Sequence, residues 1–212
     1  MKWLITGGCG FLGTSLIANL LAEGGHAVRI IDNLAVGSRE DLAEVADFHE
    51  TAPTELGAFP QPGQVELVVG DIQDAELALP VARGADVIVH FAANTGVGPS
   101  VADPRADCMN NVVGIFNYLE AARAEGVPRF VFASSNAPIG EVEPPVDEEA
   151  NPRPLSPYGA SKLAGEAYCS AYHATFGVET VVLRFGNVYG PRSKHKSSVV
   201  AQFIRRALNG EP

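Results

Sequence analysis

The chain has 212 residues, of which 46% are hydrophobic and 19% are charged, and its formal net charge is −10 at pH 7. This composition is that of a globular protein and excludes a disordered one, and the length suits one domain with a sizeable core. The acidic balance argues against a nucleic-acid surface, and no apolar run is long enough to span a bilayer. An odd count of three cysteines indicates reduced thiols. We therefore expect a cytoplasmic protein without a signal peptide.

The first predicted strand, 2–6, leads directly into a glycine-rich turn, after which leucine and isoleucine recur at helical spacing. A strand, a glycine turn and a helix in this order are the context of a dinucleotide-binding motif. Gly7 would allow the tight turn, Gly10 the close approach of a pyrophosphate, and Gly13 the close packing of the helix on the strand. The spacing G-x-x-G-x-x-G is a weak signal when it stands alone.

The second predicted strand, 27–31, ends in Asp32, nineteen positions after Gly13. An acidic side chain at this place can hold the ribose hydroxyls of NAD and would repel the additional phosphate of NADP. We therefore expect NAD as the cofactor, although Arg39 could weaken this preference. The alternative interpretation is an ordinary glycine turn with Asp32 as a solvated strand end.

Four further strands are predicted, at 66–70, 86–91, 129–134 and 179–185. Most are apolar runs without alternation, which is typical of parallel strands covered on both faces. We expect an α/β fold, a doubly wound parallel sheet of the Rossmann type with helices on both faces and the strand order 3-2-1-4-5-6. A long helix is expected at 103–125, and the segment 51–64, rich in Pro and Gly, is expected to be an exposed loop.

Another helix is predicted to begin at Ser156, a good N-cap, with Pro157 in the first helical position. Tyr158 and Lys162 then lie one turn apart on the same face. A phenol titrates near pH ~10, and a neighbouring ammonium would lower that pKa. The pair could therefore take a proton from a sugar or alcohol hydroxyl. The alternative is a surface tyrosine with an unrelated lysine.

Other reactive side chains have simpler interpretations. His90 lies inside an apolar strand and is expected to be a packed core histidine. Cys9 is expected to be a small residue that fits the turn. No Cys/His cluster has metal-ligand spacing, so no metal is expected. The basic residues 194–196 could meet a diphosphate or form a solvated loop, and both alternatives stay open.

Seven motifs together resemble those of the extended short-chain dehydrogenase/reductase family, in its NAD-dependent sugar-nucleotide epimerase/dehydratase branch. They occupy 6–13, 32–34, 70–72, 90–93, 133–135, 158–162 and 184–191, in the family's order along the whole chain. The resemblance implies an NAD-dependent enzyme that epimerises a nucleotide sugar. The first hypothesis is epimerisation of a UDP-hexose at C4 through a 4-keto intermediate. The alternatives are a dehydratase, reductase or decarboxylase of the same branch, or a dinucleotide-binding sensor without catalysis.

The resemblance assigns catalysis to Ser135, Tyr158 and Lys162. Tyr158 would remove the proton of the sugar 4-hydroxyl while hydride passes to the nicotinamide. Lys162 would hold the nicotinamide ribose and lower the pKa of Tyr158, and Ser135 would orient the reacting oxygen. Dehydratases of the branch carry an Asp-Glu pair directly after this Ser. Here Asn136 and Ala137 stand at those positions, which favours an epimerase.

Further site residues follow from the resemblance. Asn111 would fix the backbone near the strand 129–134, Phe185 would pack on the nicotinamide, and Ser134 stays an alternative to Ser135. The complete set of expected cofactor contacts is Gly7, Gly10, Phe11, Leu12, Gly13, Asp32, Asn33, Asp71, Ile72, Phe91, Ala92, Ala93, Asn111, Tyr158, Lys162 and Phe185. The expected substrate contacts are Asn94, Ser134, Ser135 and Asn187.

The resemblance also implies an organisation beyond one domain. Residues 1–190 would form the NAD-binding Rossmann domain and 191–212 the start of a substrate-binding region, with the smaller C-terminal substrate domain missing from this sequence. A homodimer is expected, in which the helices at 103–125 and 157–176 of two chains form a four-helix bundle. The other partner would be a nucleotide sugar, and neither nucleic acid nor membrane is expected.

Overall fold

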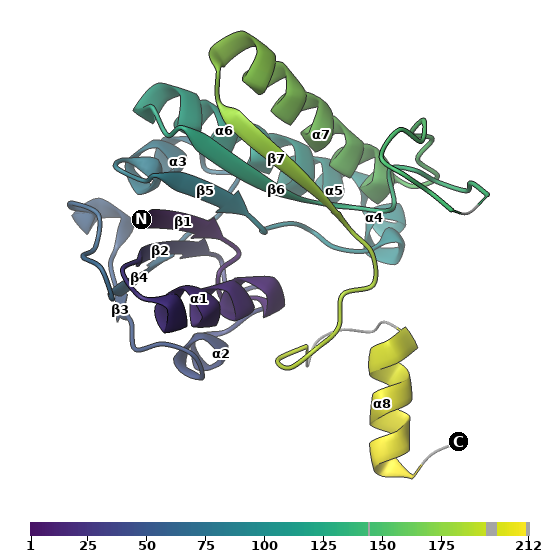
Figure 1. The fold of residues 1–212 in the computed structure, drawn as a ribbon, viewed down its shortest axis with the longest axis horizontal. Helices are drawn as coiled ribbons and strands as arrows, with labels where there is room; N and C mark the ends of the chain where they lie inside the picture. The colour runs from purple at the N-terminus through teal and green to yellow at the C-terminus, as the bar shows by residue number, and fades with distance from the viewer. Residues whose placement is uncertain (144, 194–198, 211–212) are drawn as a thin grey trace.

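A parallel sheet forms the centre of the molecule (Figure 1). The structure is a computed structural model that describes residues 1–143, 145–193 and 199–210. In these residues the sheet has seven strands in the order β3-β4-β2-β1-β5-β6-β7, and neighbouring strands run parallel. The strands are β1 (Lys2–Thr6), β2 (Ala27–Asp32), β3 (His49–Glu50), β4 (Val65–Val69), β5 (Val87–His90), β6 (Arg129–Ser135) and β7 (Glu179–Phe185). The predicted α/β fold and the order of the six predicted strands are confirmed, and the short β3 adds an edge strand.

Helices cover both faces of the sheet, with α1 and α2 on one face and α3, α6 and α7 on the other (Figure 1). None of the helices in the described residues has both the length and the apolar character that crossing a membrane requires. The helical elements are α1 (Phe11–Glu23), α2 (Arg39–Ala43), η1 (Pro53–Glu55), α3 (Ala75–Ala82), α4 (Val97–Ala102), α5 (Pro104–Cys108), η2 (Met109–Val113), α6 (Gly114–Glu125), α7 (Pro157–Phe176) and α8 (Val199–Asn209).

The helix predicted at 103–125 is present, but a π-helical turn interrupts it. Asp103 caps its start by accepting a hydrogen bond from the Ala106 N–H at 2.9 Å, and Gly126 ends it in the left-handed conformation. The π turn, η2, lies between α5 and α6 and contains Asn111. Such turns occur often at functional sites because they redirect side chains within a helix.

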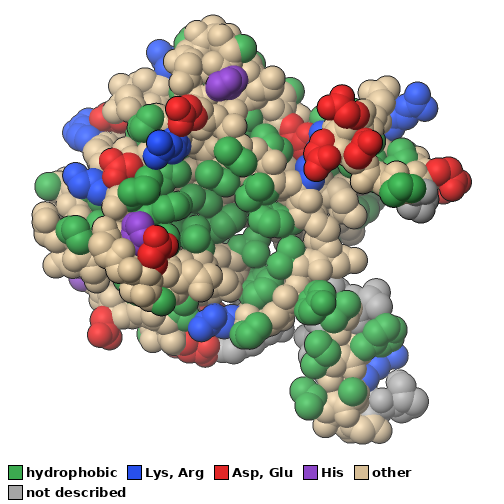
Figure 2. Space-filling model, viewed as in Figure 1, with side chains coloured by type: hydrophobic (Ala, Val, Ile, Leu, Met, Phe, Trp, Pro, Cys, Tyr) green, Lys and Arg blue, Asp and Glu red, His purple; other side chains and the backbone are tan. Residues whose placement is uncertain are grey.

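The edge strand β7 has exposed apolar side chains on one of its two faces. Thr180 faces α7, since its hydroxyl donates to the carbonyl of Cys169 at 3.1 Å. Because side chains alternate along a strand, Val181 and Leu183 point to the opposite face, where both are exposed. Figure 2 shows hydrophobic side chains gathered in the middle of this view of the molecule, over the strands of the sheet.

The segment 51–64 is mostly exposed, as its composition predicts, but it contains the short η1 turn and part of it covers a buried arginine. Arg29 on β2 is fully buried and forms an ion pair with Glu66 on β4. Its guanidinium also donates to the carbonyls of Gly57 and Ala58 and lies 4.7 Å from the centre of the Phe59 ring. Phe59 is buried in turn. A buried cation needs partners on all sides, and this segment supplies several of them.

Replacing Arg29 by Ala is expected to lower the free energy of unfolding by roughly 3–5 kcal/mol, because it leaves the Glu66 carboxylate buried and unpaired. Arg39→Ala, which breaks the exposed pair with Glu50, is the control and should have a much smaller effect, because exposed ion pairs are screened by solvent. Urea unfolding measures both. The double variant Arg29→Met with Glu66→Leu should recover most of the loss. Equal effects of the two alanine variants would contradict this view of the Arg29 pair.

Candidate functional site

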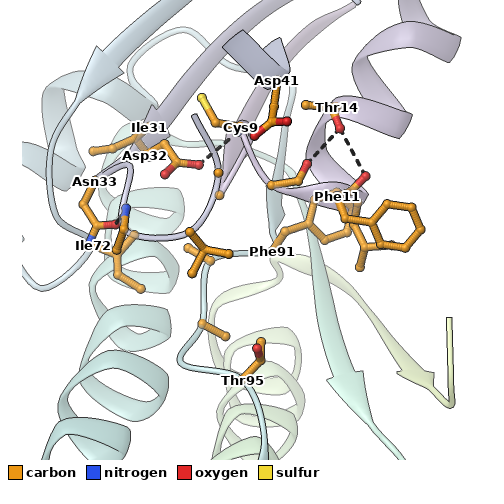
Figure 3. A pocket seen from close by; sticks show the side chains of 18 of the residues that line it. Cys9, Phe11, Thr14, Ile31, Asp32, Asn33, Asp41, Ile72, Phe91 and Thr95 are labelled. Carbon is orange, nitrogen blue, oxygen red and sulfur yellow. Dashed lines mark hydrogen bonds between the residues drawn. The ribbon is translucent and has the colours of Figure 1, made fainter. Parts of the chain in front are cut away.

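A cavity of about 530 Å³ opens at the carboxyl ends of β1, β2, β4 and β5 (Figure 3). Ligands of parallel sheets bind at this edge, next to the first strand. From that strand the chain first adds strands on one side and then on the other. The structure brings many of the predicted cofactor residues together in its lining. They are Gly7, Gly10, Phe11, Leu12, Asp32, Asn33, Asp71, Ile72, Phe91, Ala92 and Ala93, and the predicted substrate contact Asn94 lines the same cavity.

Glycines let three segments approach one another at the floor of the cavity. Gly7 has a φ of +68°, and a Cβ added there would lie 2.7 Å from the backbone nitrogen of Ala92. Gly13 lies against Gly8, where an added Cβ would come within 2.5 Å of the Gly8 Cα. Gly37, which sequence reasoning missed, would place a Cβ 2.3 Å from the carbonyl of Cys9. A side chain at these positions would force the glycine turn and its neighbours apart.

The N-terminus of α1 points its backbone N–H groups toward the cavity side of the turn. Gly10 is the N-cap, and because glycine has no side chain, it cannot cap the free N–H groups of the helix. The first N–H groups of a helix lack partners within the helix, so this terminus is suited to an anion. The Thr14 hydroxyl donates to the carbonyls of Gly10 and Phe11, which fixes the first turn (Figure 3).

Asp32 joins the glycine turn to the loop that follows β2. One carboxylate oxygen accepts a hydrogen bond from the Cys9 N–H at 2.9 Å and the other from the Leu34 N–H at 2.9 Å (Figure 3). Burial raises the pKa of Asp32, and the two backbone hydrogen bonds lower it. The alternative of a solvated strand end is therefore wrong. The guanidinium of Arg39 is bound by Glu50 at 2.7 and 2.9 Å.

The three predicted catalytic side chains lie together where β6 ends and α7 begins. Lys162 is only 3% exposed, and its Nζ donates to the carbonyl of Ala133 at 2.9 Å. The same Nζ lies 5.9 Å from the centre of the Tyr158 ring. The Ser135 hydroxyl donates to Asn136 Oδ1 at 3.3 Å and accepts from the Ala137 N–H at 3.2 Å, and it lies near enough to Tyr158 to influence the pKa of the phenol. The spacing that the sequence predicts thus places a phenol, a hydroxyl and an ammonium side by side.

The predicted effect of Lys162 on the pKa of Tyr158 is not present in this structure. Burial raises the pKa of Tyr158, the hydrogen bond from Ser135 lowers it, and the charge of Asp107 raises it. Burial lowers the pKa of Lys162 to about 8, and the charge of Asp107 works in the opposite direction. In this structure the ammonium donates its hydrogen bond to the Ala133 carbonyl, and burial is the largest influence on the pKa of Tyr158.

The hydroxyl of Ser134 has a different partner from that of Ser135. It donates to the Glu166 carboxylate at 2.5 Å, and Arg184 binds the same carboxylate at 2.7 Å. Ser134 is therefore engaged in a network between β6, β7 and α7, while Ser135 meets Tyr158. The structure favours Ser135 over its neighbour for the site.

Asn111 has a different place from the predicted one near β6. Its side-chain oxygen accepts from the Asn94 N–H at 2.8 Å, and its nitrogen donates to the Asn94 carbonyl at 2.9 Å. It therefore fixes the segment that follows β5, because the amide is committed to Asn94 and to Asp107 and Ser161. Asn111 is thus a residue that shapes the cavity wall from behind.

Several predicted residues lie outside the lining of the large cavity. They are Gly13, Ser134, Ser135, Tyr158, Lys162, Phe185 and Asn187. Gly13 has its predicted packing role instead, and Phe185 accepts a backbone hydrogen bond from Asn136 at the end of β7. The structure therefore contains a cavity of about 530 Å³ and, outside its lining, the cluster of the predicted catalytic side chains. Residues 194–196, the basic cluster of the sequence, lie outside the described residues.

The remaining reactive groups are structural. His90 is buried, its Nδ1 lies 3.1 Å from the Thr6 hydroxyl, and burial lowers its pKa to about 3. The prediction of a core histidine is confirmed. Burial raises the pKa of the Cys9 thiol to about 12, as expected for a packed small residue. Over the described part of the chain, no group of three or more potential metal ligands is present.

Sequence reasoning missed Gly37 and Asp107. A glycine five positions after Asp32, just before the helix cap Ser38, is a signal that a loop returns close to another backbone, and it could have been used. Asp107 gives no such signal, because a single Asp on a predicted helix normally indicates a solvated face. The structure shows it buried and within electrostatic reach of Tyr158 and Lys162.

Comparisons with known proteins agree with this geometry. The sequence model described as "NAD dependent epimerase/dehydratase family" matches residues 3–212. A UDP-glucose 4-epimerase of Mycolicibacterium smegmatis is 37% identical over 217 residues, which cover 99% of this chain and 64% of that protein. A dTDP-glucose 4,6-dehydratase of the same organism is 34% identical over 216 residues, which cover 99% of this chain and 60% of that protein.

A solved structure shares the fold over the whole chain. The crystal structure of Thermus thermophilus UDP-glucose 4-epimerase in complex with NAD is 40% identical, with a TM-score of 0.83, and the match covers 100% of this chain and 64% of that chain. This chain therefore spans 60 to 64% of the length of these three relatives.

The buried Lys162 predicts a pH-dependent stability difference. Its folded-state pKa of about 8 lies below the ordinary 10.5, so below about pH 8 the folded state bears the full cost of the buried ammonium. That cost falls as the pH rises, because the folded state releases the proton before the unfolded chain does. Loss of the buried ammonium should therefore raise the free energy of unfolding of Lys162→Met relative to the wild type at neutral pH. This contribution should shrink by about 2 kcal/mol between about pH 7 and about pH 9.5. Urea unfolding across this range measures the difference between the two proteins, and a difference that does not change with pH would contradict the buried-ammonium assignment.

Proposed function

The chain belongs to the NAD dependent epimerase/dehydratase family, and from this premise we propose that it epimerises a nucleotide sugar, a UDP-hexose at C4. Membership confirms the resemblance that the motifs indicate, and NAD, the predicted cofactor, is the cofactor of the family. The observation that carries the proposal is the placement of Tyr158 beside the buried Lys162, whose Nζ lies 5.9 Å from the centre of the Tyr158 ring, with Ser135 near enough to influence the pKa of Tyr158. Relatives named as UDP-glucose 4-epimerases support this choice of substrate.

The residues of the large cavity fit NAD. Gly7 and Gly37 let neighbouring backbone segments pack closely against the glycine turn, which holds the turn in place, and the open N-terminus of α1 suits a pyrophosphate. Each carboxylate oxygen of Asp32 accepts one backbone hydrogen bond and retains a lone pair for a ribose hydroxyl. In this proposal Asp71 and Ile72 flank the adenine, and Phe91, Ala92 and Ala93 line the cleft. NAD, when bound, supplies the acceptor and donor of hydride.

The proposed chemistry of the chain is a proton transfer at the sugar 4-hydroxyl. Tyr158 takes this proton in its phenolate form and later returns it, and the nearby Ser135 hydroxyl orients the reacting oxygen. Lys162 donates one of its three N–H groups to the Ala133 carbonyl, and the other two are available to the nicotinamide ribose and to Tyr158. Phe185 and Asn187, at the end of β7, complete the proposed nicotinamide and substrate side.

The residues after Ser135 support an epimerase over a dehydratase. A dehydratase must move additional protons to remove water from the sugar, so it needs acid and base groups beside the catalytic hydroxyl. Asn136 and Ala137 occupy these positions and do not titrate. The Ala137 N–H donates to the Ser135 hydroxyl at 3.2 Å, so this segment supports Ser135. Because the relatives also include a dTDP-glucose 4,6-dehydratase, that reaction is the second candidate.

The proposal extends to the organisation of the protein. Residues 1–190 form the NAD-binding domain, since the sheet and nearly all of the cavity lie there, and 191–212 begin the substrate-binding region. A homodimer is supported by an aromatic cluster on α6 and α7, in which Phe116, Tyr168 and Phe176 are exposed and pack around the buried Tyr172. In it Phe116 and Tyr168 lie 5.5 Å apart between ring centres, and Tyr172 and Phe176 lie 5.0 Å apart.

The test is incubation of the protein with UDP-glucose and a trace of NAD, with UDP-galactose detected by chromatography. Epimer should form without stoichiometric cofactor, because hydride returns to the same sugar. Tyr158→Phe should reduce the rate by about 10²–10⁴-fold, whereas Tyr168→Phe, an exposed tyrosine on the same helix, should retain it.

Other results would overturn the proposal in distinct ways. Product that requires stoichiometric reduced cofactor would indicate a reductase, and a 4-keto-6-deoxy product from dTDP-glucose would indicate the dehydratase. Binding of NAD without turnover of any nucleotide sugar would indicate a sensor. A Tyr158→Phe variant with full activity would remove the assigned base.

A further inference from the structure

Asp107 is a buried carboxylate that the proposed proton transfer does not use. It lies on α5 and is 1% exposed. A carboxylate in such a place is unfavourable unless hydrogen bonds or an opposite charge compensate for the lost hydration. One partner is the side-chain nitrogen of Asn111, which donates to Asp107 Oδ1 at 2.9 Å. The same nitrogen lies 3.2 Å from the Ser161 hydroxyl, in the residue directly before Lys162.

The carboxylate lies at the contact between α5 and the first turns of α7. A small cavity of about 250 Å³ is lined here by residues of both helices, among them Asp107, Pro157, Ala160 and Ser161. Tyr158 and Lys162 project from these same turns of α7. Asp107 thus lies against the turns of α7 that carry Tyr158 and Lys162.

The charge of Asp107 complements that of Lys162. The groups around the ammonium are the Ala133 carbonyl, the Phe132 ring at 4.9 Å, Tyr158, and His90 on β5. His90 is neutral at physiological pH, because its pKa falls to about 3, and Tyr158 is neutral because burial raises its pKa. Among the described residues, Asp107 is the carboxylate whose charge acts on Lys162 and favours its protonated form.

We propose that Asp107 is a positioning residue for the catalytic pair, supplying the counter-charge of the buried Lys162 ammonium and, through Asn111, fixing α5 against the start of α7. The same negative charge disfavours a phenolate at Tyr158. Asp107 therefore favours, in the resting protein, an ammonium beside a neutral phenol, and Tyr158 must release its own proton before it can take one from the substrate. The catalytic meaning of this state depends on the proposed function, but the electrostatic relation between Asp107 and Lys162 does not.

The test is a titration of Lys162 by NMR in protein with isotope-labelled lysine, with the signal assigned from Lys162→Met. In the wild type the midpoint should lie near pH 8. Asp107→Asn keeps the volume and one oxygen that can accept from Asn111, so it removes the charge alone. Its midpoint should fall by about 1 unit or more, since an opposite charge nearby shifts a pKa by this amount. The protonated fraction at neutral pH would then fall from roughly 90% to roughly half.

Glu179→Gln, which removes an exposed carboxylate paired with Arg129 at the other end of β7, is the charge control and should leave the midpoint in place. A folded Asp107→Asn with an unchanged midpoint would overturn the proposal. If that variant does not fold, Asp107→Leu replaces the polar group by an apolar one and is titrated in the same way, with the same two outcomes. Because the titration needs no substrate, its failure is distinguishable from a failure of the epimerase assay.

Discussion

The carboxylate of Asp32 is the interaction on which the cofactor side of the molecule depends. It accepts one backbone hydrogen bond from Cys9 in the glycine turn and one from Leu34 in the loop after β2, and so ties together two segments that the sheet alone only brings near. Leu34 has a φ of +59°, which is unfavourable for a leucine and which the hydrogen bond to Asp32 helps to maintain. The close approach of Gly37 to Cys9 completes this junction. The cavity keeps its shape because these three contacts reinforce one another.

The proposed catalytic side chains lie at the same edge of the sheet, where the difficulty is to keep an ammonium buried. A parallel sheet ends all its strands together, so β5 and β6 deliver the Asn94 segment and Ser135 to neighbouring places. Between them, α7 brings a phenol and an ammonium into a low-dielectric environment. The ammonium is tolerated because it has a carbonyl, an aromatic ring and the charge of Asp107 around it. Both sides thus place polar groups at strand ends and keep them there with buried hydrogen bonds.

The fold and much of the site are predictable from the sequence because they depend on local patterns. Apolar runs define six strands, the glycine trio places the turn, and the capped helix start brings Tyr158 and Lys162 to one face. These local patterns do not show which segments that are distant in the chain come into contact in the fold. The two residues of β3 are too few for a pattern, and Gly37 matters only through a contact with Cys9. Asn111 holds the segment after β5, not the strand 129–134, because a π turn redirects it. Asp107 looks like any solvated acid until α5 is packed on α7.

The most direct measurement of the central claim is calorimetric binding of NAD and NADP to the wild type and to Asp32→Asn. The account predicts that the wild type binds NAD more tightly by at least about tenfold, or about 1.4 kcal/mol, because the carboxylate favours ribose hydroxyls and opposes an added phosphate. The asparagine variant should weaken NAD binding and reduce the ratio. Equal affinity of the wild-type protein for the two dinucleotides, or an unchanged ratio in Asp32→Asn, would contradict the account.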